Sequence, residues 1–281
     1  MTGILWLVSY PKSGNTWLRF LIAHLVQGRL PPSAELQSMI PDAHRTRECA
    51  IADGSRRLVK THWLPTRLPQ AGRTAGFVYV ARNPWDVIAS NARFAMLCAD
   101  PATLRKPAQA RARLKDAYVE RFIRHRGDPR WIEHGIGSWD EHLSAWREAA
   151  SKVPSLFLRY EDLLERPQGE VGRLARFLGL AAGKEAIARA VDETSFGALR
   201  ALEESEIRAR RPGLFWGDLR DPARAAGHRF MAKAGARFGR DEFPAEQWAR
   251  IAETFAAEIE TLGYGASALA LGHQAGQRRC A

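Results

Sequence analysis

The chain has 281 residues, 46% of them hydrophobic and 26% charged, which is typical of a globular protein with a full core. No apolar stretch approaches the ~20 residues of a membrane span, and the start lacks a basic stretch and cleavage site, so we expect a cytoplasmic protein. The three scattered cysteines, Cys49, Cys98 and Cys280, argue against a disulfide framework or a cysteine-ligated metal.

The formal net charge of +11, from 42 Lys and Arg against 31 Asp and Glu, raises the question of nucleic-acid binding. The basic residues alternate with acidic ones along the predicted helices, as in Arg147-Glu148, and no zinc finger or RNA-binding signature is present. We therefore interpret the charge as a sign of an anionic small-molecule ligand. The ratio of 35 Arg to 7 Lys is typical of a GC-rich bacterial genome.

Predicted strands and helices alternate along the chain, with short apolar runs indicating strands and a period of 3.6 indicating helices. The predicted strands are 4–8, 58–62, 76–80 and 155–159. The predicted helices are 16–27, one that opens at Asn83-Pro84, 137–150, 167–179, 183–192 and 244–262. This alternation predicts one α/β domain over residues 1–265, with a mainly parallel sheet flanked by helices.

Four segments have no clear period. Residues 29–57 predict loops with a short helix, and residues 98–136, interrupted by prolines, predict helices and a lid. Residues 203–229, rich in Arg, Gly and Pro, predict a mobile loop, and residues 266–281 a frayed C-terminal tail. We expect ligand specificity to depend on residues 29–57, 95–136 and 203–229.

The segment between the first strand and the first helix reads Ser-Tyr-Pro-Lys-Ser-Gly-Asn-Thr-Trp over residues 9–17. The first N–H groups of a helix lack partners and its dipole is positive there, so such a turn can hold an anion. A lysine, two hydroxyls and a glycine strengthen that prediction. The common ATPase loop Gly-x-x-x-x-Gly-Lys-Ser/Thr is absent, because the lysine here precedes the glycine.

This loop resembles the 5′-phosphosulfate loop of the PAPS-dependent sulfotransferases, Tyr-Pro-Lys-Ser-Gly-x-x-Trp, and four further segments up to residue 196 match the same family in order. The resemblance implies a P-loop-kinase-like architecture, PAPS (3′-phosphoadenosine 5′-phosphosulfate) as sulfuryl donor, no metal, and a small-molecule acceptor with a hydroxyl. It places the 5′-phosphate and adenine against Pro11, Lys12, Ser13, Gly14, Asn15, Thr16 and Trp17.

The second segment, Arg-Asn-Pro-Trp-Asp over 82–86 with a serine at 90, resembles the 3′-phosphate motif of the family. Arg82 follows a predicted strand, where its guanidinium can fork onto a phosphate. The resemblance implies that Arg82 and Ser90 hold the 3′-phosphate. The family usually completes this site with Arg-Lys-Gly-x-x-Gly-x-Trp, but residues 230–239 lack the first Arg and the Trp. Lys233 is expected to reach the 3′-phosphate, with Arg237 as a candidate substitute.

The third segment, Lys60-Thr61-His62, resembles the family's Lys-x-His. An imidazole titrates near neutrality, which suits a general base. The resemblance implies that His62 takes the acceptor's proton, that Lys60 contacts the sulfuryl oxygens, and that Lys12 stabilises charge growing on the leaving phosphate.

The last two segments, Arg-Tyr-Glu-Asp over 159–162 and Thr-Ser-Phe over 194–196, resemble the parts of the family that contact the adenine. The residues assigned to it are Tyr160, Thr194, Ser195 and Phe196. Gly137-Ser138-Trp139 with His142 also resembles a family motif, which we expect to be mainly structural.

Two other functions stay open on the sequence alone. An ATP-dependent small-molecule kinase shares this architecture, although no Gly-Lys-Ser/Thr loop and no clear Mg²⁺-holding Asp follow a strand. A catalytically silent nucleotide- or RNA-binding protein would account for the basic charge, although Lys12 and His62 are both present. The acceptor's identity and a homodimeric state are not readable.

Overall fold

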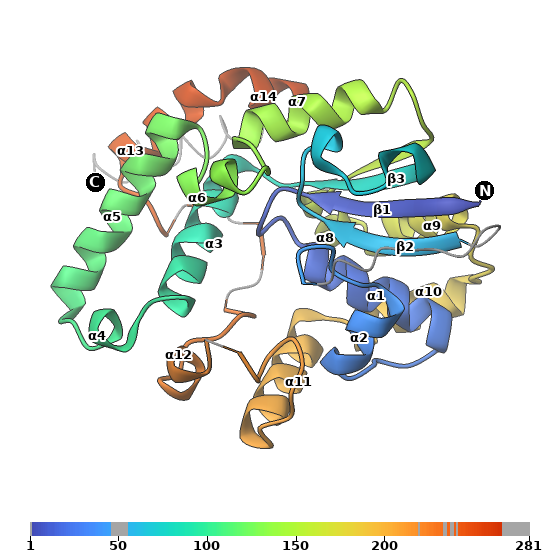
Figure 1. Ribbon diagram of the computed structural model, residues 1–281, viewed down its shortest axis with the longest axis horizontal. Coiled ribbons are helices and arrows are strands. Elements are labelled where there is room, and N and C mark those ends of the chain that lie inside the picture. The colour runs from blue at the N-terminus through green and yellow to red at the C-terminus, as the bar shows by residue number, and fades with distance from the viewer. Residues whose placement is uncertain are drawn as a thin grey trace, which may run out of the picture.

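The computed structural model describes residues 2–45, 56–218, 220–232, 235–236, 239 and 241–265. Lys233, Arg237 and the predicted tail 266–281 lie outside the described residues. Figure 1 shows an α/β arrangement around a parallel sheet whose described strands have the order β2-β1-β3-β4. The strands are β1 (Gly3–Ser9), β2 (Arg56–Thr61), β3 (Thr74–Ala81) and β4 (Ser155–Arg159). The four predicted strands and the parallel sheet are confirmed.

One face of the sheet packs against α1 (Asn15–Gln27), α8 (Tyr160–Glu165), α9 (Pro167–Leu178) and α10 (Lys184–Glu193). Leu5 and Leu7 of β1 point to this side, while Trp6 and Val8 point to the other. Both sets are fully buried, because parallel strands covered on two faces consist of continuous apolar runs. The apolar run that predicted β1 is therefore explained by burial on both faces.

The opposite face packs against α7 (Trp139–Ala149) through Leu143 and Trp146. Next to it, a second group of helices surrounds its own apolar cluster at the carboxyl end of the strands (Figure 1). These helices are α3 (Pro84–Leu97), α5 (Ala108–His125), α13 (Ala245–Thr254) and α14 (Ala256–Thr261). The short helix α4 (Pro101–Leu104) lies between α3 and α5, and α6 (Pro129–Glu133) lies between α5 and α7. The 3₁₀ turns η1 (Pro65–Arg67) and η2 (Ala71–Arg73) lie between β2 and β3.

Below the sheet in Figure 1, α2 (Ser33–Met39), α11 (Phe196–Arg208) and α12 (Asp221–Ala225) form a third group. The expected mobile loop over 203–229 is therefore wrong in part, because α11 extends to Arg208 and α12 lies within it. The helix escaped the periodicity argument because Glu203 and Glu206 lie on its buried side, where an apolar residue is expected.

The predicted single helix 244–262 is divided into α13 and α14 at Phe255, whose φ of −114° and ψ of 25° interrupt the helical backbone. Phe255 is buried within the helical cluster, so tertiary packing overrides the helical pattern there. Among the described residues, none of the helices has the length and apolar character required to traverse a bilayer.

Candidate active site

A cavity of about 570 Å³ opens at the carboxyl ends of the strands, the usual position of ligand sites in open parallel sheets. Its lining combines segments that are far apart in the sequence: the loop after β1, the end of β2, α3, and residues 42–45 and 230–232. The predicted site residues that line it are Pro11, Lys12, Gly14, Asn15, Thr16, Trp17, Lys60, His62, Arg82, Ser90, Tyr160 and Phe196.

Three predicted residues do not line the cavity. Ser13 is buried under the loop. The Thr194 hydroxyl donates to the Ala190 carbonyl (2.7 Å), and the Ser195 hydroxyl accepts the Ala198 N–H (3.4 Å) as the N-cap of α11. These two side chains stabilise helix ends here, so their contact with an adenine stays a prediction.

The loop between β1 and α1 has left-handed backbone at two positions, Lys12 (φ 72°) and Gly14 (φ 100°). A Cβ atom at Gly14 would lie 2.5 Å from Cδ2 of Tyr160, so only glycine fits there. Asn91 of α3 fixes the start of the turn by donating to the Pro11 carbonyl (3.1 Å). The first N–H groups of α1 are thereby held at the cavity.

Several buried polar atoms of this region have no hydrogen-bond partner among the described residues. They include Oγ of Ser13, Nε1 of Trp17 and Nε of Arg82. Buried donors are normally paired, and an unpaired one costs about 1–3 kcal/mol. Unpaired donors around the turn between β1 and α1 are compatible with a ligand whose oxygen atoms accept hydrogen bonds.

Arg82 contacts two segments of the site that are far apart in the sequence. Its guanidinium donates to the carbonyls of Lys12 and Gly235 (both 3.2 Å) and stands 4.2 Å from the ring centre of Tyr160. Arg82 also lies 3.5 Å from Asp86 of α3. The guanidinium is thus fixed at the end of β3 before any ligand binds, as its predicted role requires.

The Lys12 ammonium lies within an aromatic pair, with Nζ 3.8 Å from the ring centre of Phe230 and 4.6 Å from that of Phe94. Burial, together with the charges of Arg220 and Arg93, lowers the pKa of Lys12 to about 7. A new negative charge beside Nζ would reverse this shift, because it favours the protonated amine. Lys12 is therefore poised to gain charge when an anion arrives.

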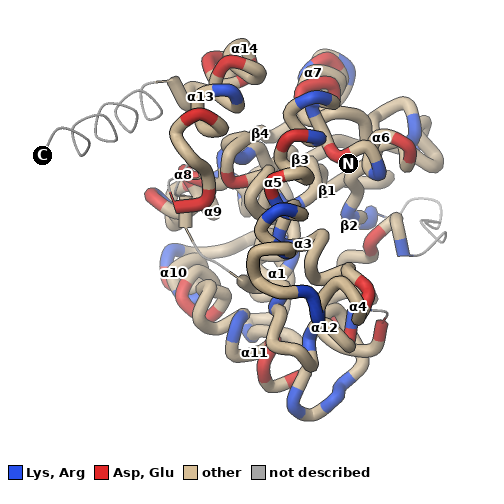
Figure 2. The backbone as a smooth tube through the Cα atoms, turned by 90° about the vertical axis from the view of Figure 1, so that its left-hand side faces the viewer, with Lys and Arg blue, Asp and Glu red and all other residues tan. Residues whose placement is uncertain are grey.

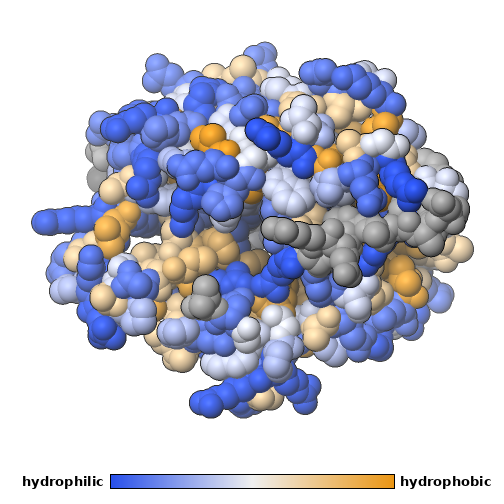
Figure 3. Space-filling view, in the orientation of Figure 1, coloured by the Kyte–Doolittle hydropathy of each residue, from blue (hydrophilic) through white to orange (hydrophobic). Residues whose placement is uncertain are grey.

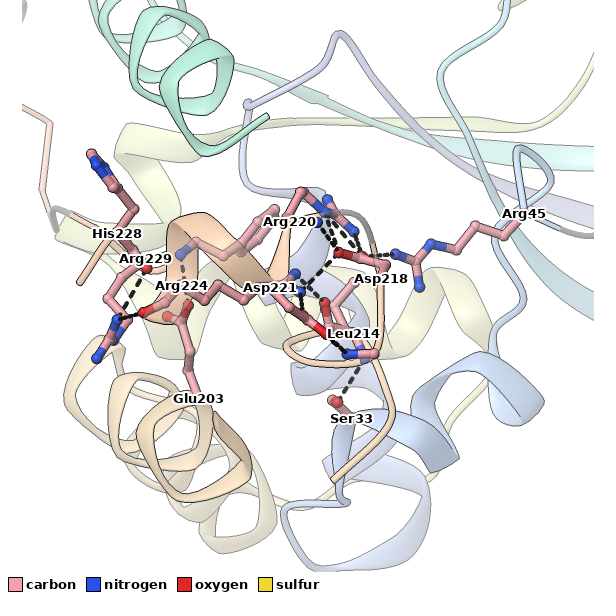
Figure 4. A network of polar contacts seen from close by, with 12 residues as sticks. Ser33, Arg45, Glu203, Leu214, Asp218, Arg220, Asp221, Arg224, His228 and Arg229 are labelled. Carbon is pink, nitrogen blue, oxygen red and sulfur yellow. Dashed lines mark hydrogen bonds and ion pairs between the residues drawn. The ribbon is translucent and has the colours of Figure 1, made fainter. Parts of the chain in front are cut away.

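The Phe230 side of this pair is held by α11. The buried Glu203 carboxylate accepts the backbone N–H groups of Phe230 (2.6 Å) and Met231 (2.8 Å), and Arg200 donates to the Met231 carbonyl (2.6 Å). Figure 4 shows Glu203 rising from α11 toward this segment. Sequence reasoning missed Glu203, because its position in the predicted loop gave no signal.

The His62 ring is oriented by the backbone. Nδ1 lies 2.6 Å from the Ser9 carbonyl, which only accepts, so Nδ1 carries the proton and Nε2 keeps the free lone pair. The His62 carbonyl in turn accepts from Nε2 of His142 (3.0 Å), whose Nδ1 accepts from the Tyr79 hydroxyl (2.9 Å). Burial and the Lys60 ammonium keep the pKa of His62 well below its ordinary value, so the ring is neutral at neutral pH.

Lys60 is paired with a residue that the sequence analysis did not single out. Its Nζ lies 3.0 Å from both carboxylate oxygens of Asp42, and both residues are buried. Backbone bonds from Lys60 to Pro41 (2.8 Å) and from Ala43 to Lys60 (2.9 Å) place Asp42 alongside β2. Burial lowers the pKa of Lys60 to about 8, against the opposing effect of the Asp42 carboxylate.

His44 lies two residues after Asp42 and lines the same cavity. Its Nε2 accepts the backbone N–H of His62 (2.9 Å), and its ring stands 4.3 Å from that of Trp63. Asp42 and His44 come from an aperiodic segment and meet β2 only through tertiary pairing. Local pattern therefore gave no signal for them.

A sequence profile described as the sulfotransferase domain matches residues 3–263. This chain belongs to the sulfotransferase family. Among curated proteins, Sulfotransferase 1A1 of Rattus norvegicus is 31% identical over 203 residues, covering 67% of this chain and 64% of that protein. Sulfotransferase 1C2 of Oryctolagus cuniculus is 32% identical over 204 residues, covering 67% and 62%. The chain thus spans somewhat less than two thirds of the length of these two relatives.

Solved sulfotransferase structures have the same fold. Mouse sulfotransferase SULT7A1, complexed with PAP, aligns with a TM-score of 0.65 and 19% identity over 97% of this chain and 89% of that one. Retinol dehydratase, in a complex with retinol and PAP, aligns with a TM-score of 0.63 and 20% identity over 92% and 82%. The sulfotransferase architecture predicted from the motifs is therefore confirmed.

Proposed function

We propose that this protein moves the sulfuryl group of PAPS to a hydroxyl of a small-molecule acceptor. The observation that supports this most is that the Lys12 loop, Lys60, His62 and Arg82 line one cavity in a chain of the sulfotransferase family. Two structures of the same fold were solved with PAP, one of them also with the alcohol retinol. The acceptor hydroxyl would become a sulfate ester.

The donor atoms of the cavity fit PAPS. Trp17 and Arg82, which line it, each offer a buried polar atom without a partner among the described residues. The start of α1 and the Lys12 ammonium suit the 5′-phosphosulfate. Arg82, just before α3, and Ser90, within it, suit the 3′-phosphate. Lys233 completes the proposed 3′-phosphate site, and Tyr160, Thr194, Ser195 and Phe196 the adenine site.

In the proposed mechanism, His62 acts as general base. Nδ1 stays protonated against the Ser9 carbonyl, and Nε2 takes the proton of the acceptor hydroxyl. When bound, PAPS supplies the sulfuryl group, which passes to the acceptor oxygen and leaves PAP. Lys12 and Lys60 place positive charge where negative charge develops, which is the main contribution of side chains to this class of transfer.

We further infer that the protein works in the bacterial cytoplasm, without a metal and without nucleic acid. Figure 2 shows basic and acidic residues interspersed along most helices, which favours a solvated surface over a nucleic-acid groove. The ratio of 35 Arg to 7 Lys supports a bacterial source. Residues 1–265 would form the catalytic domain, and sedimentation would test for a homodimer.

The test is a thermal-shift titration with PAP, AMP, and ATP with Mg²⁺. A ligand at 100 times its dissociation constant stabilises the native state by about 2.7 kcal/mol. We expect a large shift with PAP and a small one with AMP, which lacks the 3′-phosphate. A shift with ATP–Mg²⁺ and none with PAP would instead identify a kinase and refute the proposal.

A further inference from the structure

The cavity lining is strongly basic. Among the described residues it contains a single acid, Asp42, which is already paired with Lys60. Its basic members are Lys12, Arg19, Lys60, Arg45, Arg82, Arg93, Arg220 and Arg229. A lining of this kind attracts anions, and the donor alone does not account for all of it.

Most of these cations have another partner or a proposed role. Lys12, Lys60 and Arg82 are assigned to the sulfuryl donor. Three others are bonded away from the cavity centre: Arg19 to the Leu36 and Ile40 carbonyls, Arg93 to Glu242, and Arg229 to the Arg224 and His228 carbonyls. Arg45 and Arg220 also have a partner, Asp218, but they share it.

Arg45 and Arg220 share one carboxylate. Arg220 donates to the Asp218 carboxylate through Nε, which lies 3.0 Å from each oxygen, and through Nη2. Arg224 donates to the same group (2.9 Å), whereas Arg45 reaches it only through Nη2 at 3.3 Å. Figure 4 shows Arg45 extending to Asp218 from a separate segment of the chain. Arg224 also donates to Asp221 (2.8 Å), so three guanidiniums face two carboxylates and one positive charge stays uncompensated.

Both arginines keep donors that bond to none of the described residues: Nε and Nη1 of Arg45, and Nη1 of Arg220. Arg45 is exposed, Arg220 is half-buried, and both line the cavity, so these donors are accessible to a ligand. A guanidinium presents its donors in a planar fork that matches a carboxylate. The site can therefore accept a second carboxylate beside that of Asp218.

Each of the two arginines lies near a residue of the proposed reaction. Arg45 follows His44, which accepts the backbone N–H of His62. Arg220 stands 5.7 Å from the ring centre of Phe94, the same ring that faces the Lys12 ammonium. The guanidiniums thus border the space between the proposed base and the proposed phosphosulfate contact.

Flat apolar surface completes this half of the cavity. Phe94 and Trp131, whose ring centres lie 6.3 Å apart, and Trp63 all line it. Figure 3 shows apolar residues in tan meeting hydrophilic residues in blue at the centre of this face. Aromatic walls favour a flat ring, and the arginines favour a negative charge on it.

Resting on the proposed function, we propose that the acceptor is an aromatic hydroxy acid. Its carboxylate would bind Arg45 and Arg220 and remain unreacted, while its hydroxyl faces Nε2 of His62. In the transfer, the bond between sulfur and the bridging oxygen of PAPS breaks, the acceptor oxygen bonds to sulfur, and the hydroxyl proton passes to His62. Arg45 and Arg220 would then determine acceptor specificity.

The first test measures binding without turnover. Calorimetry on the protein saturated with PAP compares 4-hydroxyphenylacetate with its neutral counterpart, 4-hydroxyphenylacetamide. We expect the acid to bind at least about tenfold more tightly, since hydrogen bonds to charged groups are the stronger ones. Equal binding of the two, or tighter binding of the amide, would overturn the proposal, and so would PAP binding with neither compound bound.

The second test uses variants. Arg45→Gln should bring the ratio of kcat/KM for acid over amide close to one, while Arg45→Lys should retain part of the preference. Arg29→Gln, which removes a surface guanidinium paired with Glu35, is the matched control and should leave the ratio unchanged. A preference that survives in Arg45→Gln and in Arg220→Gln would overturn the assignment.

The PAP affinity of the wild type and of each variant distinguishes a failure of the proposed function from a failure of the proposed acceptor class. If the wild-type protein fails to bind PAP, the proposed function fails. If it binds PAP but Arg45→Gln weakens PAP instead of the acid, these guanidiniums hold the donor and the acceptor class is wrong. Unchanged PAP affinity with a lost preference for the acid supports the proposal.

Discussion

The ammonium of Lys60 lies 3.0 Å from each oxygen of the Asp42 carboxylate, and this buried ion pair joins the end of β2 to the segment after α2. The carboxylate counteracts the effect of burial on Lys60, whose pKa is lowered to about 8. Loss of the Asp42 charge would lower this pKa further, so that Lys60 becomes neutral at a lower pH.

We therefore expect Asp42→Asn to move the alkaline limb of the pH profile of kcat toward lower pH, since kcat reports the bound complex, in which Lys12 has regained its charge. Below that limb Lys60 stays protonated, so activity should be retained best in the acidic range. Removal of one partner from a buried pair also destabilises the fold by about 3–5 kcal/mol, so thermal unfolding is measured alongside. An alkaline limb that coincides with that of the wild type would show that Lys60 does not act as a charged group.

His62→Ala should lower kcat by about 10²–10⁴-fold, since general bases contribute that much, while PAP affinity stays near the wild-type value. The reason is that Nε2 faces the proposed acceptor, whereas the ring is anchored to Ser9 and not to the phosphate-binding turn. Steady-state kinetics and PAP calorimetry give the two readouts. His125→Ala, at an exposed histidine of α5, is the matched control. Unchanged turnover in His62→Ala would remove the assignment as base.

PAP binding should take up a proton at Lys12 near pH 7.5. The free protein holds the pKa of Lys12 at about 7, so at that pH the amine is partly neutral, and a bound phosphate raises the pKa and restores the charge. Calorimetry in two buffers of different ionisation enthalpy measures the uptake. Lys12→Arg keeps the charge permanently and should lose the proton contributed by this residue. Equal uptake by the two proteins would contradict the prediction.

Glu203→Gln should weaken PAP binding through the backbone of Phe230 and Met231. The amide keeps one acceptor oxygen for two N–H groups, so one of them loses its partner at a cost of about 1–3 kcal/mol. The segment lines the cavity, and its displacement would loosen the ring over Lys12. Calorimetry and thermal unfolding should both report the loss, whereas Glu185→Gln, on the exposed side of α10, should change neither. PAP affinity equal to that of the wild type would show that the hydrogen bonds from Phe230 and Met231 to Glu203 do not support the site.

The four strands and the turn between β1 and α1 could be predicted because their signals are local. β1 is a continuous apolar run, and Asn83 and Pro84 mark the start of α3 as N-cap and first residue. The signal failed where partners are distant. α11 buries Glu203 and Glu206 against backbone N–H groups of other segments. The spacing of residues within the helix does not indicate these distant partners.

The same difference between local signals and distant partners applies to the site residues. The residues of the Lys12 loop and Lys60-Thr61-His62 could be found from short motifs, whereas Asp42, His44 and Arg45 depend on a segment that pairs with β2 through tertiary contacts. The motif at 194–196 matched its pattern, yet Thr194 and Ser195 bond to the ends of α10 and α11. Short motifs located residues that line the cavity, whereas the residues contributed by tertiary pairing could be found only from the structure.

The left-handed backbone of Lys12 sets folding stability against activity at a single position. A non-glycine residue in that conformation costs about 1–2 kcal/mol, while glycine adopts it without steric strain. Replacement by glycine would relax the turn and also remove the ammonium held between Phe94 and Phe230. A directed-evolution campaign that selects this protein for heat resistance alone would therefore tend to discard Lys12, and screening for turnover in every round would be needed to keep it.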